Sequence, residues 1–116
     1  MTKIRFSQEA KEIYDILGNL ASTSKKERMI FLSLKQKLEH IEKNPHYGEP
    51  ISKKIIPEVY KIKYGITNLF RIELPQFWRM LYTLTSEDDE VEIIAFILDV
   101  VDHKKYDKRF GYFKKK

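Results

Sequence analysis

Basic and proton-transferring side chains recur in the second half of this sequence, in positions suited to acting on a phosphodiester. Lys61 and Lys63 alternate with apolar and aromatic residues in 59–64, and Arg79 interrupts an aromatic and aliphatic run at 77–82. The planar guanidinium of arginine can hold two phosphate oxygens at once, and lysine adds a positive point charge. These three residues are therefore candidate catalytic groups.

His103 and Tyr106 follow the last apolar run and are spaced to share one face of a short helix. Histidine titrates near neutral pH, so it can take or give a proton. Tyrosine can stack on a base, donate a hydrogen bond or give up its proton. His103 and Tyr106 are the fourth and fifth candidate catalytic residues. Alternatively, the histidine caps a helix and the tyrosine packs on the sheet.

The three cations also have structural alternatives. Lys61 and Lys63 could occupy a solvated outer face of a strand. Arg79, which is costly to bury without a partner, could form an ion pair with Glu73 of the neighbouring strand. Arg71, one strand earlier, is the rival arginine for a phosphate-binding role.

The positive charge of the chain is concentrated at its C-terminal end. Residues 103–116 hold seven Lys or Arg and one acid, whereas the rest holds fifteen Lys or Arg and sixteen acids. A basic tail favours a polyanion such as RNA or DNA through counterion release, although a solubilising tail would have the same composition. The candidate RNA-binding residues are Lys104, Lys105, Lys108, Arg109 and Tyr112.

The sequence carries no clear metal or cofactor signature. It has no cysteine, and Asp99, Asp102 and His103 are close together without forming a known ligand motif. No glycine-rich phosphate loop and no Gly-x-Ser-x-Gly motif occur. We therefore expect a protein that uses neither a metal nor a cofactor.

The composition bounds the class of protein. A chain of 116 residues, 42% hydrophobic and 34% charged, fits a single domain over 1–116 with a basic tail at 103–116. The N-terminus lacks the apolar segment of a secretion signal. The longest strongly apolar run, 93–98, is too short to cross a membrane. We expect a cytoplasmic protein with no membrane partner.

Hydrophobic periodicity places two helices first. A short strand at 3–6 leads to Ser7, a plausible N-cap, and apolar residues at helical spacing then continue to position 20. Ser24 and Glu27 read as a capping box for a second, longer helix that Asn44 and Pro45 end. Together they predict an antiparallel helical hairpin.

A change to a period of two predicts the sheet. After a loop at 46–58, strands are expected at 59–64, 69–74, 77–85 and 91–101, the last being central and buried on both faces. Asp102 would cap a final short helix that Gly111 ends. The fold class is α+β: an N-terminal strand and helical hairpin packed on a mostly antiparallel four- to five-stranded sheet, with a short C-terminal helix.

The order of these motifs resembles the RelE/ParE toxin superfamily. The segments that carry the resemblance are 59–64 (Val-Tyr-Lys-Ile-Lys-Tyr), 77–82 (Phe-Trp-Arg-Met-Leu-Tyr), the apolar strand 91–101, 102–106 (Asp-His-Lys-Lys-Tyr) and 110–112 (Phe-Gly-Tyr). Each motif is short, but their order spans nearly the whole chain. The nearest resemblance is to RelE-like messenger RNA interferases of type II toxin–antitoxin systems.

The resemblance implies a ribosome-dependent endoribonuclease that inhibits translation by cutting messenger RNA in the ribosomal A site. In that family the ribose 2′-OH attacks the adjacent phosphate without a metal. By position, Lys61 or Lys63 would be general base or phosphate clamp, and Arg79 would stabilise transition-state charge. His103 matches a position that is often basic. Tyr106, or Tyr112 in its place, would stack on a base or orient the 2′-OH.

One departure from the family pattern leaves the general acid open. The arginine that the family carries near the start of its last segment has no clean match here. Lys104 is the nearest residue, and lysine is not equivalent to arginine at a bidentate site. Two other functions stay open: a ParE-like toxin that inhibits DNA gyrase, and a non-catalytic nucleic-acid-binding module or inactivated toxin. A toxin also implies a small acidic antitoxin as partner.

Overall fold

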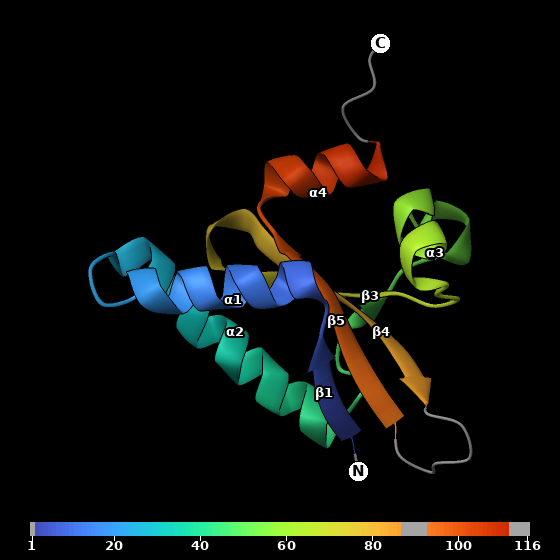
Figure 1. Ribbon diagram of the computed structural model, residues 1–116, viewed down its shortest axis with the longest axis horizontal. Helices are drawn as coiled ribbons and strands as arrows, with labels where there is room; N and C mark the ends of the chain where they lie inside the picture. The colour runs from blue at the N-terminus through green and yellow to red at the C-terminus, as the bar shows by residue number, and fades with distance from the viewer. Residues whose placement is uncertain (1, 87–92, 112–116) are drawn as a thin grey trace.

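The computed structural model describes residues 2–86 and 93–111. Figure 1 shows the elements in chain order. They are β1 (Thr2–Phe6), α1 (Gln8–Leu20), α2 (Lys25–Lys43), β2 (Glu49–Pro50), the 3-10 turn η1 (Lys53–Ile55), α3 (Glu58–Tyr64), β3 (Phe70–Leu74), the 3-10 turn η2 (Pro75–Phe77), β4 (Trp78–Ser86), β5 (Ile93–Val101) and α4 (His103–Phe110).

One mixed sheet carries the molecule, with its strands in the order β1-β5-β4-β3-β2. β1 runs parallel to β5, and the other neighbours are antiparallel. This confirms the expected α+β fold with a helical hairpin and a short C-terminal helix. The expected burial of the last long strand on both faces is also confirmed, because β5 is buried from Leu98 to Val101 and lies between two strands.

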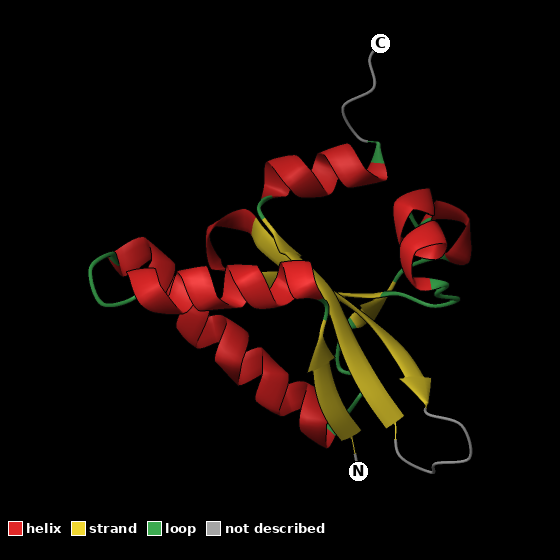
Figure 2. Cartoon of the chain, in the orientation of Figure 1, coloured by secondary structure: helices red, strands yellow, loops and turns green. Residues whose placement is uncertain are grey.

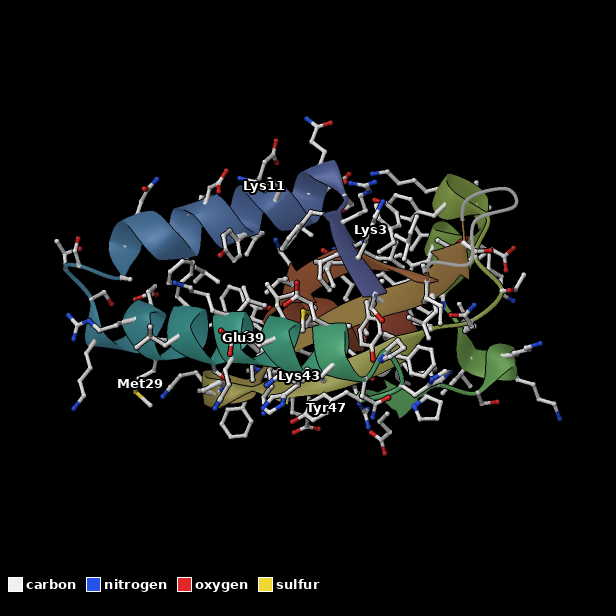
Figure 3. All side chains as sticks on the ribbon, turned by 90° about the horizontal axis from the view of Figure 1, so that it is seen from below. Lys3, Lys11, Met29, Glu39, Lys43 and Tyr47 are labelled. Carbon is white, nitrogen blue, oxygen red and sulfur yellow. The ribbon has the colours of Figure 1, made fainter. Side chains whose placement is uncertain are left out.

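Two separate hydrophobic cores cover the two faces of the sheet, and helices lie on both sides of it in Figure 2. The first core joins α1 and α2 to the inner residues of β3, β4 and β5. Figure 3 shows α1 and α2 side by side against the sheet. The predicted face of Trp78, Met80, Tyr82 and Leu84 packs in this core.

Ser7 confirms its predicted role as the N-cap of α1. Its Oγ accepts a hydrogen bond from the backbone N–H of Ala10 at 3.0 Å, and it donates to the carbonyl of Leu98 at 2.7 Å. The same hydroxyl therefore starts the helix and fixes it to β5. Ser24 behaves differently from the predicted capping box: its hydroxyl donates directly to the Glu27 carboxylate, and no side-chain bond caps the backbone of α2.

The second core lies on the opposite face of the sheet, beneath α3 and α4. It contains Tyr60 of α3, Tyr106 of α4 and the outward residues of β4 and β5, among them Leu81 and Leu98. As predicted, Asp102 caps α4 by accepting from the Lys105 N–H at 2.9 Å, and Gly111 ends it in a left-handed conformation. The second core therefore places α4, with its basic residues, over the sheet.

The segment predicted as a strand at 59–64 is instead helix α3 (Glu58–Tyr64). Pro57 precedes its first turn and Gly65 ends it at φ 63°, which are ordinary helix boundaries. Residues 60 and 64 satisfy both a period of two and a helical spacing of four, so the pattern was ambiguous. Ile62 resolves it: it is 78% exposed, whereas a strand face would have buried it.

A buried tyrosine on the middle strand fixes the loop after α2. Asn44 ends α2 as predicted. The hydroxyl of Tyr82 then donates to the carbonyl of Pro45 and accepts from the N–H of Gly48, both at 2.8 Å. Gly48 is needed there, because an added Cβ would come within 2.8 Å of the Tyr82 ring. This clamp sets the position of the next residue, Glu49.

No helix in 2–86 or 93–111 combines the length and apolar character needed to cross a membrane.

Candidate functional site

The hairpin of β3 and β4 brings two arginines to one face of the sheet. Arg71 pairs with Leu81 across the hairpin, and Glu73 pairs with Arg79. Since residues two apart share a face, Arg71 and Arg79 are diagonal neighbours on the side covered by α4. Arg79, a predicted catalytic residue, and Arg71, its rival in the sequence, are thus brought together by the register.

Tyr106 of α4 lies between the hairpin and the helix and contacts both arginines. Its hydroxyl accepts from Arg71 Nη1 at 2.9 Å. The guanidinium carbon of Arg79 lies 4.6 Å from the centre of its ring and that of Arg71 lies 5.9 Å away. Two cations are thus held by one aromatic side chain, in the geometry of cation–π contacts.

Base stacking, one expected role of Tyr106, does not fit this position. The residue is 3% exposed, and Phe110 stacks on its ring with centroids 4.4 Å apart. Tyr106 is therefore a positioning residue that holds Arg71 and Arg79. The other tyrosine considered, Tyr112, lies outside the described residues.

Carboxylates lie close to both arginines. Arg71 also donates to the carboxylate of Glu49. Burial opposes its charge, but the hydrogen bonds to Glu49 and Tyr106 outweigh it and raise the pKa of Arg71. The buried Nε atoms of Arg71 and Arg79 have no hydrogen-bond partner within the described residues. Glu73, opposite Arg79 in the hairpin register, is a second carboxylate, so these four side chains carry no net charge and the excess positive charge nearby comes from α4.

The alternative considered for Arg79, an ion pair with Glu73, is not formed within the described residues, and Arg79 makes a backbone contact instead. The two residues are opposite each other in the hairpin register, yet Arg79 Nη1 donates to the carbonyl of Phe77 at 3.3 Å and its guanidinium turns toward Tyr106. Arg79 is thereby kept on the α4 side of the sheet.

His103 is the first residue of α4 and is exposed. Its ring meets that of Phe77 edge to face, with centroids 5.9 Å apart. Because the Phe77 carbonyl is bound by Arg79, the histidine lies at the margin of the arginine pair. Its imidazole is accessible for proton transfer.

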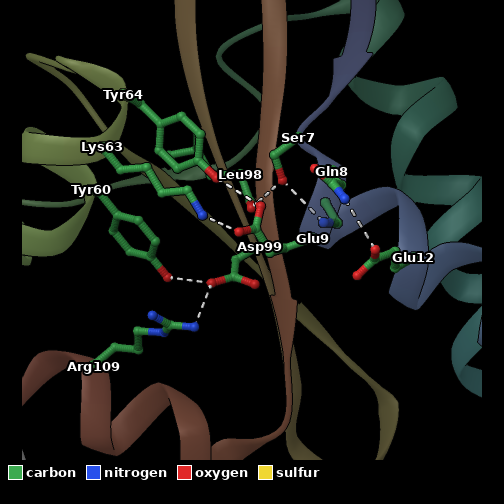
Figure 4. Close-up of polar contacts among 11 residues, drawn as sticks. Ser7, Gln8, Glu9, Glu12, Tyr60, Lys63, Tyr64, Leu98, Asp99 and Arg109 are labelled. Carbon is green, nitrogen blue, oxygen red and sulfur yellow. Dashed lines mark hydrogen bonds and ion pairs between the residues drawn. The ribbon is translucent and has the colours of Figure 1, made fainter.

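Lys61 and Lys63 do not lie on a strand beside the arginines, because their segment is α3. Lys63 reaches the N-terminal turn of α1, where it binds the carboxylate of Glu9, and Figure 4 shows the contact. That hydrogen bond lowers the pKa of Glu9 and raises that of Lys63. Lys61 is exposed on α3. The predicted lysine pair is thus a structural contact plus a surface cation.

Asp99, considered as a possible metal ligand, is engaged by two other side chains. It accepts from the Tyr60 hydroxyl at 2.8 Å and pairs with Arg109 at 3.4 Å, as drawn in Figure 4. Burial, followed by the charge of Asp99, raises the pKa of Tyr60 above its usual range, so the phenol stays protonated and donates. Asp102 caps α4, and the described residues contain no group of three or more potential metal ligands.

An open groove of about 550 Å³ separates α3 from α4. Three of the predicted RNA-binding residues, Lys105, Lys108 and Arg109, line its α4 side. Pro57, Glu58 and Val59 line the α3 side. Lys104 is exposed on the first turn of α4. The groove therefore presents three cations and one carboxylate to solvent.

Sequence reasoning missed two partners at the site. Glu49 lies in a segment predicted as a loop, but it forms the two-residue strand β2, whose pairing with β3 places it opposite Arg71. Tyr60 was assigned to a strand face, whereas its hydroxyl reaches Asp99. Arg71, the rival arginine of the sequence analysis, occupies a polar position in the strict alternation of 70–74, which already predicts the sheet face that it shares with Glu73. Comparison of the chain with protein-family models, with curated proteins and with solved structures finds no match.

Proposed function

We propose that this chain is a RelE-like endoribonuclease that cuts messenger RNA in the ribosomal A site and so inhibits translation. The observation that carries the proposal is the convergence of Arg71 and Arg79 on Tyr106, on the sheet face beneath the basic helix α4. Paired guanidinium groups suit a phosphodiester, whose charge grows as it passes to a phosphorane. The motif order that resembles the RelE/ParE superfamily supports the same assignment.

The proposed reaction is a transesterification within the RNA. The ribose 2′-oxygen forms a bond to the adjacent phosphorus while the bond from phosphorus to the 5′-oxygen breaks. A base takes the 2′-OH proton and an acid protonates the leaving 5′-oxygen. The products are a 2′,3′-cyclic phosphate and a 5′-OH. Arg71 and Arg79 would hold the non-bridging oxygens through the reaction.

Two side chains at the margin of the arginine pair suit the proton transfers. Glu49 is 64% exposed and its carboxylate is held beside Arg71, so it can accept a proton near the bound phosphate. His103 is exposed next to Phe77 and can donate one. Lys61 and Lys63 are left out of this scheme, because Lys63 is bound to Glu9 and both lie on α3.

The proposed partners are the ribosome with its messenger and an acidic antitoxin, both met in the cytoplasm. The groove between α3 and α4 suits an acidic segment, since Lys105, Lys108 and Arg109 line it. Two apolar side chains of α3 are exposed: Val59, which lines the groove, and Ile62, which lies on the same helix. An antitoxin docked there would also cover α4.

The test is cleavage of messenger RNA by purified ribosomes programmed with a defined codon in the A site. Wild-type protein should produce fragments ending in 2′,3′-cyclic phosphate, and Arg79→Ala and Arg71→Ala should lower the rate by about 100-fold each. Arg28→Ala is the matched control: this exposed arginine of α2 bonds only a neighbouring carbonyl among the described contacts, so cleavage should be unchanged.

Three results would contradict the proposal. Equal cleavage by wild type and Arg79→Ala would remove the arginine pair from the site. DNA breaks that depend on gyrase, without RNA cleavage, would favour the ParE-like function. RNA binding without cleavage in the presence of ribosomes would favour a non-catalytic module or an inactivated toxin.

A further inference from the structure

The turn between β3 and β4 holds two consecutive side-chain-bearing residues in the left-handed region. Gln76 and Phe77 both have φ of 62°. L-residues adopt this conformation at a steric cost, and large side chains do so least often. Strain of this kind persists where the surrounding structure imposes it, and it concentrates at functional sites.

Burial does not compensate for the strain at Phe77. The residue is 73% exposed, against 40% for the surface tyrosine Tyr47. Its described ring contact is the edge of His103. Exposing a large apolar ring in a strained conformation destabilises the free protein in two ways. A ligand that covers the ring would offset the cost of its exposure to water.

The backbone of Phe77 is tied to the arginine pair. Its carbonyl accepts from Arg79 Nη1 at 3.3 Å, and the guanidinium of Arg79 lies over Tyr106, which also holds Arg71. An exposed aromatic ring thus belongs to a residue bound by Arg79, whose guanidinium shares the Tyr106 ring with that of Arg71. That combination, a stacking surface beside a phosphate-binding pair, is how proteins hold unpaired nucleotides.

We propose that Phe77 is a stacking platform for an unpaired nucleobase adjacent to the phosphate held by Arg71 and Arg79. The inference rests on the proposed function and narrows its substrate to single-stranded RNA with an unstacked base at the cleavage point. A base inside a duplex is covered on both faces, so it cannot stack on Phe77. Phe77 thereby takes the role that the buried Tyr106 cannot fill.

The experiment measures binding of the protein to ribosomes programmed with either of two strands that cannot be cleaved: a messenger with a 2′-O-methyl codon in the A site, and the same messenger with abasic ribose-phosphate units at that codon. Phe77→Gly should weaken binding of the base-bearing strand by about 5- to 150-fold, the range for loss of one stacked base. Its binding of the abasic strand should be unchanged. Phe77→Trp should retain wild-type affinity for both, because it restores the stacking surface.

A second measurement separates a stacking role from a structural one. Glycine adopts positive φ without strain, so Phe77→Gly should raise the thermal midpoint while it weakens binding. Leu32→Ala is the matched control: it removes a 57% exposed side chain from α2 and should leave both affinities unchanged.

Each contrary outcome separates the platform from the proposed function. Unchanged affinity of Phe77→Gly for the base-bearing strand, with Arg79→Ala abolishing binding of both probes, overturns the platform and leaves the nuclease standing. Equal losses for the base-bearing and abasic strands overturn stacking as the cause. Failure of the wild type to bind either strand counts against the proposed function and the platform together.

Discussion

The guanidinium of Arg79 lies over the ring of Tyr106, with its central carbon 4.6 Å from the ring centre. Arg79 belongs to β4 and Tyr106 to α4, so this contact joins the C-terminal helix to the middle strand of the sheet. The same ring carries the hydroxyl that binds Arg71. Tyr106 thus positions both arginines. Substitutions that remove its hydroxyl alone, or its hydroxyl and ring together, separate the contributions of these two groups.

Tyr106→Phe keeps the ring over Arg79 and removes the hydroxyl that binds Arg71. We expect an unfolding free energy lower by about 1.5 kcal/mol, since the lost hydrogen bond involves a charged group. Tyr106→Leu also removes the cation–π contacts and core packing, and should cost about 3 kcal/mol. Urea titrations measure both. If Tyr106→Phe lowers the cleavage rate as much as Tyr106→Leu does, the ring does not position Arg79.

Tyr82→Phe tests the clamp that places Glu49. The substitution leaves the Gly48 N–H and the Pro45 carbonyl without their partner, which we expect to cost about 1–3 kcal/mol of unfolding free energy. RNA cleavage should also slow, because the loop then holds Glu49 less firmly at Arg71. Tyr47→Phe serves as control, since its exposed hydroxyl has only a 3.4 Å contact with Lys37 among the described bonds.

Asp99 should matter for stability through Tyr60 and Arg109. Asp99→Asn retains an acceptor for the Tyr60 hydroxyl but loses the charge that faces Arg109, and should cost about 1 kcal/mol. Asp99→Leu leaves the buried hydroxyl without a partner and should cost about 3 kcal/mol. Asp15→Asn, in an exposed pair with Lys11, should change stability by less than about 0.5 kcal/mol in the same denaturation assay.

The salt dependence of RNA binding should identify the contribution of α4. Lys105→Ala and Lys108→Ala, both in the groove between α3 and α4, should each lower the slope of log K against log salt by about 1. Lys43→Ala, exposed at the end of α2, should leave the slope unchanged. Equal slopes for the α4 variants and the Lys43 control would mean that RNA does not contact the groove.

The contact between Glu9 and Lys63 should weaken in acid. The pKa of Glu9 is lowered by its hydrogen bond with Lys63, so its contribution to stability is full above the unfolded pKa and is lost as pH falls through the folded one. The pKa of Lys63 is raised by the same contact. Its contribution to stability is therefore full at pH values below its unfolded pKa, and it is lost as the pH rises through its folded pKa.

A double-mutant cycle of Glu9→Gln and Lys63→Met at pH 7 and at pH 3 checks this dependence. The coupling free energy should be larger at pH 7 than at pH 3, because it is lost as the pH falls through the lowered pKa of Glu9. High salt should reduce it at pH 7, because both side chains are about half exposed. A coupling that is the same at both pH values would show that the charges do not carry the contact.

The local sequence determined most of the elements in this chain. Ser7, Asp102 and Gly111 are helix boundaries in the structure as they are in the sequence, because capping depends only on residues a few positions apart. The face shared by Trp78, Met80, Tyr82 and Leu84 also follows from local alternation. The exception is α3, where seven residues are too few for a period of two and a helical period to diverge.

Only the tertiary structure decided which charges meet. Arg71 and Arg79 converge through the hairpin register, Tyr106 reaches them through the docking of α4, and Glu49 joins through the pairing of β2 with β3. A sequence records that a cation interrupts an apolar run, but not which carboxylate, ring or carbonyl will satisfy it. That partner is set by long-range packing, which brings together side chains separated by tens of residues.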